Sequence, residues 1–366
     1  MTASADMPPE RKKSRSGYSL RPSASLALIS LLLALVGVGL IALTLGAAGI
    51  PLARLPAALA LSTDGSSGAH LARDQLVLWS IRIPRIATAA VVGALLAISG
   101  AIMQGLFRNP LADPALVGVS SGGAFAAAAA IVFTDSRFGE HFRFMQNQLL
   151  PLAAFAGSLV TTVILYRIAS RSGRTSIAIF LLAGLAIAAI ANAGTGLLVF
   201  VADDRQLRDI TFWLLGSLSG ATWPKIAMLA PVLGLGLIAR VTVARGLDVL
   251  VLGEAEAFHS GVDVERLKRI SIVLVSGMTG VAVSICGVVG FIGIVAPHLL
   301  RLVIGPAHRL LLPASALLGA VLLVGADTLA RSLVAPAEMP IGILTAAVGA
   351  PFFLGMLLRQ RALVAL

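Results

Sequence analysis

The sequence predicts an all-α, polytopic membrane protein, and three observations lead to this fold class. Hydrophobic residues make up 58% of the 366-residue chain and charged residues only 12%, whereas about a quarter of an average soluble domain is charged. The apolar runs 25–48, 87–106 and 149–166 are each close to the roughly 20 residues that cross a bilayer. These runs are continuous, whereas the strands of a membrane barrel alternate between apolar and polar residues.

Taken in order, the apolar runs predict ten membrane-spanning helices within residues 24–361, after a basic tail at 1–23. The eighth span is short and is interrupted by Gly293 and Pro297, so we expect it to cross only part of the bilayer. Ten spans divide into two five-helix halves, and related halves of this size would have inverted topology. The expected spans are 24–47, 78–106, 114–133, 149–168, 176–200, 224–243, 270–289, 296–304, 313–331 and 341–358.

The basic residues predict how these spans are oriented. The chain has a net charge of +11, and a cytoplasmic N-terminus places 18 of its 28 lysines and arginines on the inside. Because cytoplasmic loops are enriched in basic residues, this bias predicts that both ends of the chain are cytoplasmic. A basic chain can also bind nucleic acid, but here the charges lie between apolar spans, so we expect no such partner.

The connection 202–223, between the fifth and sixth spans, is external in this topology. It begins with charged residues and becomes apolar, but its apolar part is too short to span a bilayer. We therefore expect a short external helix that dips back toward the membrane as a re-entrant segment. Asp203, Arg205 and Arg208 are candidates for lining an external mouth, although any loop exposed to water needs charged residues.

The connection 247–269 is cytoplasmic and is much longer than a simple turn requires. A short run that favours a helix, Glu254–His259, lies between two glycines. The apolar residues of this loop would be exposed unless another protein covered them, which favours a docking site over a solvated connector. These apolar residues are Leu247, Val249, Leu250, Val251, Leu252 and Phe258.

The spans lack the residues that catalysis or ion coupling would require. Their central thirds contain almost no ionisable side chain, and Asp327 lies toward the outer end of the ninth span. The sequence has no cluster with metal-ligand spacing and no phosphate-binding GxxxxGK[ST] loop. Uphill transport would therefore need energy from a partner. An ion-coupled secondary transporter and an intramembrane enzyme remain as alternatives of a different class.

Three arginines stand at the external ends of spans. Arg82 and Arg85 lie in the sequence RIPR, and Arg331 follows the ninth span. An isolated arginine at this depth commonly extends to the lipid headgroups. The alternative is bidentate pairing with the carboxylates of an acidic protein. Spacing alone leaves these two interpretations about equal.

Six motifs follow one another in an order typical of one family. They are RIPR at Arg82–Arg85, GALLAISGAIMQGLFRNPLADPALVGVSSGG at Gly93–Gly123, LLAGLA at Leu181–Ala186, LGEAEAFHSG at Leu252–Gly261, GFIGIVAPHLLRL at Gly290–Leu302 and MPIGILTAAVGAPFF at Met339–Phe353. Through them the chain resembles, from about Trp79 to Leu358, the FecCD-type permeases of ABC importers for iron chelates, haem and cobalamin.

The resemblance implies a type II importer fold, with a homodimer of ten-helix subunits in the bacterial inner membrane and a pathway on the two-fold axis. Two cytoplasmic ATPase subunits, which bind ATP and Mg²⁺, would drive transport. A periplasmic binding protein would deliver the substrate. We expect no cofactor and no ATPase site in this chain itself, which is surrounded by membrane lipid.

The resemblance also implies roles for individual residues. Arg82, Arg85 and Arg331 correspond to residues that meet glutamates of the binding protein. Asn109 and Leu111 fall on a cytoplasmic gate, and Thr175 and Ser176 on a second gate element. The loop that contacts the ATPase falls on residues 252–261, with contact residues Leu252, Gly253, Glu254, Ala255, Phe258, His259 and Gly261.

The substrate implied by the resemblance is haem. The external stretch Gln206–Trp223 is most similar to the haem permeases, whereas cobalamin permeases differ there. Ferric siderophores and cobalamin remain the alternatives. No residue is an evident ligand of haem iron, as expected for a weakly binding passage whose specificity resides in the binding protein.

Overall fold

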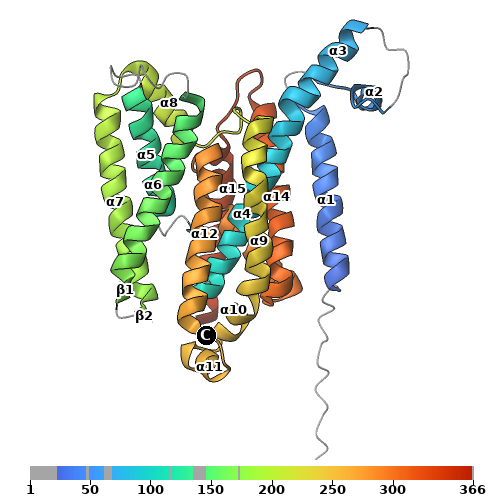
Figure 1. The fold of residues 1–366 in the computed structure, drawn as a ribbon. Helices are drawn as coiled ribbons and strands as arrows, with labels where there is room; N and C mark the ends of the chain where they lie inside the picture. Colours follow the sequence, from blue (N-terminus) through green and yellow to red (C-terminus); the bar gives the residue numbers. More distant parts are fainter. Residues whose placement is uncertain are drawn as a thin grey trace, which may run out of the picture.

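Long helices that run roughly side by side make up most of the computed structural model (Figure 1). It describes residues 23–46, 49–61, 68–114, 118–134, 146–171 and 174–364. The basic tail expected at 1–23 therefore lies, apart from Ser23, outside the described residues.

Each of the ten expected spans has a helical counterpart. Seven helices in the described part of the chain are long and apolar enough to cross a membrane, and three more are apolar but shorter. The second span begins earlier than expected, because α3, η2 and α4 follow one another without a break and form one continuous helix. In chain order the ten are α1 (Ala24–Thr44), α3 (Gly68–Val77) with η2 (Leu78–Arg82) and α4 (Ile83–Leu106), α5 (Val119–Thr134), α6 (Gln146–Ala169), α7 (Ile177–Val201), α9 (Trp223–Thr242), α12 (Val264–Cys286), α13 (Ile292–Ile304), α14 (His308–Leu333) and α15 (Ile341–Val364).

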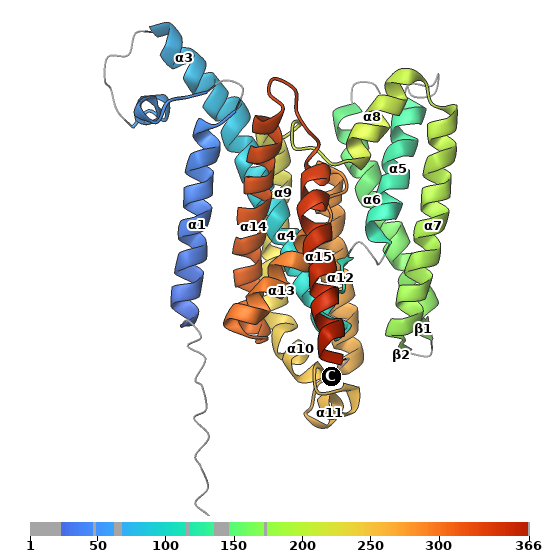
Figure 2. The same cartoon turned by 180° about the vertical axis from the view of Figure 1, so that it is seen from behind.

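Short elements gather at the two ends of the bundle (Figures 1 and 2). The end called external below, following the predicted orientation, carries η1 (Leu52–Arg54), α2 (Leu55–Ala58) and α8 (Asp204–Leu214). The end called cytoplasmic carries α10 (Ala244–Leu250), α11 (Glu254–His259) and a hairpin of β1 (Ser170–Arg171) and β2 (Arg174–Thr175). The first residue of α1 and the C-terminus both lie at this end, as an even number of spans requires.

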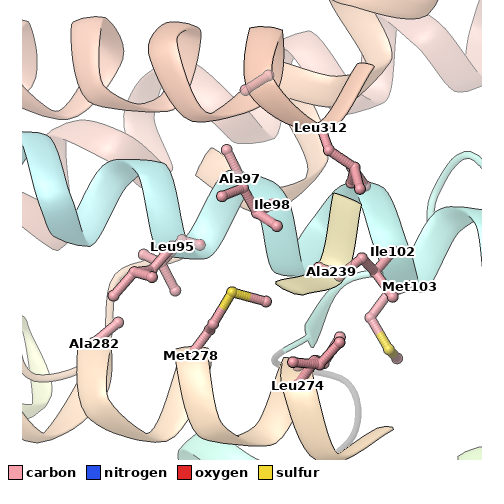
Figure 3. Close-up of a cluster of buried hydrophobic side chains, with 14 of the residues drawn as sticks. Leu95, Ala97, Ile98, Ile102, Met103, Ala239, Leu274, Met278, Ala282 and Leu312 are labelled. Atoms are coloured by element: carbon pink, nitrogen blue, oxygen red, sulfur yellow. The ribbon is translucent and has the colours of Figure 1, made fainter. Parts of the chain in front are cut away.

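The core is built around α4, which is buried almost continuously from Val92 to Leu106. Its apolar side chains pack against α12, α9 and α14 (Figure 3). Burial of apolar side chains between helices excludes both water and lipid, and it positions the ends of these helices relative to one another. The side chains labelled in Figure 3 are Leu95, Ala97, Ile98, Ile102 and Met103 of α4, Ala239 of α9, Leu274, Met278 and Ala282 of α12, and Leu312 of α14.

Glycines let the backbone of α4 approach two other helices closely. A methyl group added at Gly100 would lie 1.8 Å from the carbonyl oxygen of Gly293 in α13. One added at Gly93 would lie 2.3 Å from the carbonyl oxygen of Gly319 in α14. Small residues at such crossings are the usual means of tight helix packing in membranes.

The eighth span differs from expectation at its two predicted breaks. Gly293 and Pro297 both lie inside the 13-residue helix α13 and do not interrupt it. Proline has no backbone N–H, so the carbonyl four residues earlier, that of Gly293, loses its usual donor. The buried side chain of Gln104 approaches this region, with its amide nitrogen 3.5 Å from the carbonyl oxygen of Gly293 and 3.3 Å from that of Ile294.

Candidate functional site

The three arginines assigned to docking gather at the external end, but their side chains point inward. Arg82, Arg85 and Arg331 are only 3%, 7% and 8% exposed. The chain passes through the π-helical turn η2 just before α4, and such widened turns recur at functional sites. This turn ends at Arg82, and Arg85 follows in the first turn of α4.

Two acidic residues of the same chain offset part of the positive charge of this arginine cluster. Asp327 accepts hydrogen bonds from Arg85 Nε (3.0 Å) and Nη2 (2.9 Å) and lies 3.8 Å from Arg331 Nε. Glu338 accepts from Arg85 Nη1 at 2.8 Å, and its side chain is 48% exposed. The sequence showed that Asp327 lies near the outer end of its span, but it gave no indication that these carboxylates pair with the arginines.

The same cluster holds the end of α1. Arg82 Nη1 donates to the backbone carbonyl of Leu43, and Arg331 Nη2 donates to that of Ala42. The docking role of the three arginines stays a prediction, and the geometry adds that they join α1, α4 and α14.

A cavity of about 740 Å³ lies at the external end, among α5, α6, α8, α9 and α12. The helix α8 supplies Arg205, Asp209, Phe212 and Trp213 to its wall, and α9 supplies Lys225. The cavity is therefore lined by two cationic groups, one carboxylate and two aromatic rings. Its other walls are formed mainly by small, apolar and hydroxyl-bearing residues.

Local hydrogen bonds fix the direction of α8. Asp203 caps the helix by accepting from the backbone N–H groups of Arg205 (2.9 Å) and Gln206 (2.8 Å), a reciprocal arrangement completed by the Gln206 side chain. Asp203 thus serves as a helix cap, Arg205 lines the cavity, and Arg208 is not among the lining residues.

The segment after α8 inserts between two membrane helices. Gly216 has φ +74°, and the next residue, Ser217, donates its backbone N–H to the carbonyl of Cys286 at the end of α12 (2.8 Å). Ile341 and Gly342, which begin α15, donate to the carbonyls of Gly216 and Leu215, both at 3.0 Å. These bonds hold the cavity wall against α12 and α15.

At the cytoplasmic end, the first predicted gate segment is a tight turn after α4. Asn109 Oδ1 accepts from the backbone N–H of Leu111 at 2.9 Å, and Asn109 is exposed. The ring of Phe107, two residues earlier, contacts that of Phe180 in α7, with centroids 6.4 Å apart. The end of α4 therefore touches the beginning of α7, which the sequence analysis did not anticipate.

The second predicted gate segment joins the hairpin to α7. Thr175 ends β2 and is buried, and its hydroxyl lies 2.9 Å from that of Ser170 across the hairpin. Ser176 is the N-cap of α7 and accepts from the backbone N–H of Ile179 at 3.4 Å. A shift of the hairpin would consequently act on the first turn of α7.

The predicted ATPase-contact loop contains the helix expected from its sequence. The helix α11 spans Glu254–His259, between Gly253 with φ +128° and Gly261 with φ +81°. Glycine adopts this backbone region without the steric cost that a side chain imposes.

Only part of the apolar residues in this loop form a surface. Leu247 and Leu250 are buried in the core and do not need a partner to cover them, contrary to the expectation. Val251, Leu252 and Phe258 are 52%, 72% and 71% exposed. These three residues are called the apolar docking surface below.

A buried lysine that the sequence analysis counted only as one more cytoplasmic charge lies behind this surface. Lys268, in α12, is 3% exposed. Its Nζ donates to Glu254 at 2.9 Å, to Glu265 at 3.1 Å and to the backbone carbonyl of Thr175 at 3.1 Å. This contact joins two predicted sites that the sequence had assigned independently.

A second polar cluster connects α10 to α13 and α14. Asp248 Oδ1 lies 2.6 Å from His308 Nδ1 and accepts from the backbone N–H of His308 at 2.8 Å. Arg301 Nη2 lies 3.2 Å from His308 Nε2, so Nε2 accepts and Nδ1 carries the proton donated to Asp248. Burial alone would raise the pKa of Asp248, but the hydrogen bonds from His308 outweigh it and lower the pKa.

Comparison with known proteins identifies the family. The model of the FecCD transport family matches residues 31–359. The chain is 47% identical to the hemin transport system permease HmuU of Yersinia pestis over 294 residues, which are 78% of this chain and 84% of that protein. It is 46% identical to the cobalamin import system permease BtuC of Halobacterium salinarum over 292 residues, 80% of this chain and 76% of that protein.

Solved structures agree with this result. An inward-facing metal-chelate type ABC transporter superposes with a TM-score of 0.77 at 33% identity, covering 92% of this chain and 99% of the other. PsaBC of Streptococcus pneumoniae superposes with a TM-score of 0.53 at 17% identity, which shows a shared fold only. The ten helices and the motifs on them are thus those of an ABC importer permease, and the chain belongs to the FecCD transport family.

Proposed function

We propose that this ABC importer permease carries haem across the inner membrane. The observation that carries the proposal is the external cavity, because its chemistry complements this substrate. Haem is a flat apolar macrocycle with two carboxylates on one edge. Arg205 and Lys225 supply two cations for the carboxylates, and Phe212 and Trp213 supply apolar surface for the ring.

The cavity also suits passage without capture of the iron. Cys286 lines it, but its thiol donates to the backbone carbonyl of Ala282 at 3.0 Å and is buried. A permease must release what it receives, so ligands that bind iron strongly would slow transport.

The transporter works with partners that supply energy and recognition. We propose a homodimer with cytoplasmic ATPase subunits that contact the apolar docking surface, Val251, Leu252 and Phe258. A periplasmic binding protein docks at the external end and pairs its acidic residues with Arg82, Arg85 and Arg331. Glu338 is the exposed carboxylate of that cluster, so it is the one that the binding protein displaces.

The test is substrate-dependent ATP hydrolysis by the complete complex in proteoliposomes. Binding protein loaded with haem should stimulate hydrolysis and uptake, and protein loaded with ferric siderophore or cobalamin should not. Stimulation by cobalamin and not by haem would overturn the assignment, because the cobalamin permeases are nearly as similar to this chain.

A pair of variants tests the cavity itself. Arg205→Gln combined with Lys225→Gln should reduce haem uptake about tenfold while the binding protein still docks. Arg208→Gln on the same helix is the matched control, since it removes one positive charge outside the cavity lining. Equal uptake by the double variant and the control would contradict the role of the cavity.

A further inference from the structure

We propose that Lys268 is a positioning residue that makes α11 and the β1–β2 hairpin move together, so that displacement of α11 acts on the start of α7. The inference rests on the proposed contact between the ATPase and the apolar docking surface. We infer that the buried ammonium group of Lys268 links the ATPase contact to the second gate segment.

The geometry around Lys268 joins three separate parts of the chain. Its Nζ contacts Glu254 at the beginning of α11, Glu265 on its own helix and the backbone carbonyl of Thr175 in β2, at 2.9, 3.1 and 3.1 Å. Glu265 Oε2 accepts from the backbone N–H of Thr175 at 2.8 Å. Side chains of α12 therefore bind both backbone polar groups of Thr175.

Burial makes this arrangement resistant to partial opening. An ammonium group withdrawn from water is stable only while its partners stay in place. Lys268 is 3% exposed, whereas the Glu254 side chain is 46% exposed. If α11 moved alone, Lys268 would lose one of its two carboxylates while remaining buried. Movement of α11, α12 and the hairpin as one unit avoids this cost.

The hairpin continues directly into the gate. Thr175 precedes Ser176, the N-cap of α7, and Phe180 in the first turn of α7 contacts Phe107 at the end of α4. A continuous set of contacts therefore runs from α11 through Lys268 to both predicted gate segments. Such a path is established only by measured coupling, which the following variants provide.

Glu254→Ala and Lys268→Met are to be compared in the full complex with ATPase and loaded binding protein. In both variants the amount of substrate moved per ATP hydrolysed should fall at least tenfold. Arg266→Met is the matched control, because Arg266 is an exposed cation in the same turn of α12. Wild-type transport per ATP in Glu254→Ala would overturn the proposal, as would an equal loss in the control.

Glu254→Ala keeps the proposal testable if Lys268→Met fails to fold. It leaves Lys268 bound to Glu265 and to the Thr175 carbonyl. A purely structural role would lower the amount of folded protein and both activities together. Uncoupling instead lowers the amount of substrate moved per ATP hydrolysed by the folded complex.

A distance measurement gives an independent readout. Spin labels at positions 171 and 256 report on the hairpin and on α11, with Cys286 replaced by serine. In otherwise unmodified protein, adding nucleotide to the complex should leave this distance unchanged. In Glu254→Ala it should shift or broaden. A nucleotide-dependent shift in the unmodified protein would show that the two elements move separately and would overturn the proposal.

Phe258→Asp tests the proposed ATPase contact separately from the role of Lys268. This change places a charge in the apolar docking surface and should prevent the ATPase from copurifying. If the ATPase stays bound, the assignment of the docking surface is wrong. If the ATPase is lost but Glu254→Ala transports normally, only the role of Lys268 is wrong.

Discussion

At the scale of single residues, the arginine cluster places buried ion pairs on the same side chains that we propose as contacts of the binding protein. Arg85 has two acidic partners of different kinds: Asp327 is buried, and Glu338 is half exposed. The buried pair holds α4 to α14. The exposed pair competes with any external carboxylate for the same guanidinium group.

Glu338→Gln should strengthen docking of the binding protein. The change removes an internal competitor for Arg85 while keeping a side chain of the same size. The gain should be up to about fivefold in Kd, because a half-exposed ion pair contributes roughly 0.2–1 kcal/mol. Surface plasmon resonance on the reconstituted complex measures it, and Glu256→Gln, an exposed carboxylate at the opposite end of the bundle, is the control. Weaker docking of Glu338→Gln would count against displacement of Glu338.

Asp248→Asn should destabilise the protein in a pH-dependent manner. The pKa of Asp248 is lowered from the ordinary value of 3.8 in the folded protein, so its ionised form stabilises the fold above that pH. This contribution is lost as the pH falls through the folded pKa. The variant should lose about 1 kcal/mol at pH 7.

Thermal unfolding in detergent between pH 7 and pH 3 checks this. The deficit of Asp248→Asn relative to wild type should shrink as the solution becomes more acidic. Glu256→Gln, an exposed carboxylate at the same end, should show no deficit. A deficit that stays constant with pH would mean that the charge of Asp248 contributes nothing.

At the scale of elements, local sequence signals located the helices that carry the site. The two glycines around Glu254–His259 set the ends of α11, and apolar run length located the spans. The interior of α13 was beyond such signals. A proline inside a helix usually breaks it, so Pro297 predicted an interruption. The side chain that approaches the carbonyl of Gly293, which lost its donor, belongs to Gln104, and this residue is distant in the sequence.

The sequence also gave no indication that the ATPase-contact loop and the second gate segment lie in contact. Glu254 and Thr175 were each assigned by resemblance, but only packing shows that Lys268 touches both. Likewise, Leu247 and Leu250 looked like exposed apolar residues of a loop until the fold buried them. Tertiary contacts of this kind leave no periodic pattern in a single sequence.

The crossing of α4 and α13 should tolerate no added methyl group. In Gly100→Ala the new Cβ would lie 1.8 Å from a backbone oxygen of Gly293, which cannot move aside as a side chain can. We expect a loss of about 1–3 kcal/mol or more. Gly234→Ala in α9 is the control, because no atom beyond the neighbouring backbone of its own helix lies within 4 Å of its Cβ position. Equal unfolding temperatures of the two variants would contradict this packing.

At the scale of the whole molecule, the fold is that of an ABC importer permease. The charged clusters described above lie at the two ends of the bundle, whereas the labelled centre of α4 in Figure 3 is apolar. The ATPase partner implied by the family would act at the cytoplasmic end.

The chain alone, in sealed vesicles with an ion gradient, should not concentrate haem. Addition of the ATPase subunits, the binding protein and internal ATP should restore uptake, and a protonophore should leave that uptake unchanged. Haem absorbance inside the vesicles after removal of external haem measures the result. Accumulation by the permease without its ATPase would favour the ion-coupled alternative.

The end of α1 has a consequence for any shortened form of the protein. The last four carbonyls of a helix lack donors within it, and in α1 those of Ala42 and Leu43 receive theirs from Arg331 and Arg82. Removing α1 would leave the buried guanidinium groups of Arg82 and Arg331 without these two carbonyl acceptors. Water cannot easily replace the acceptors at a buried position. Trimming the chain to nine crossings would therefore require both arginines to be replaced by neutral residues at the same time.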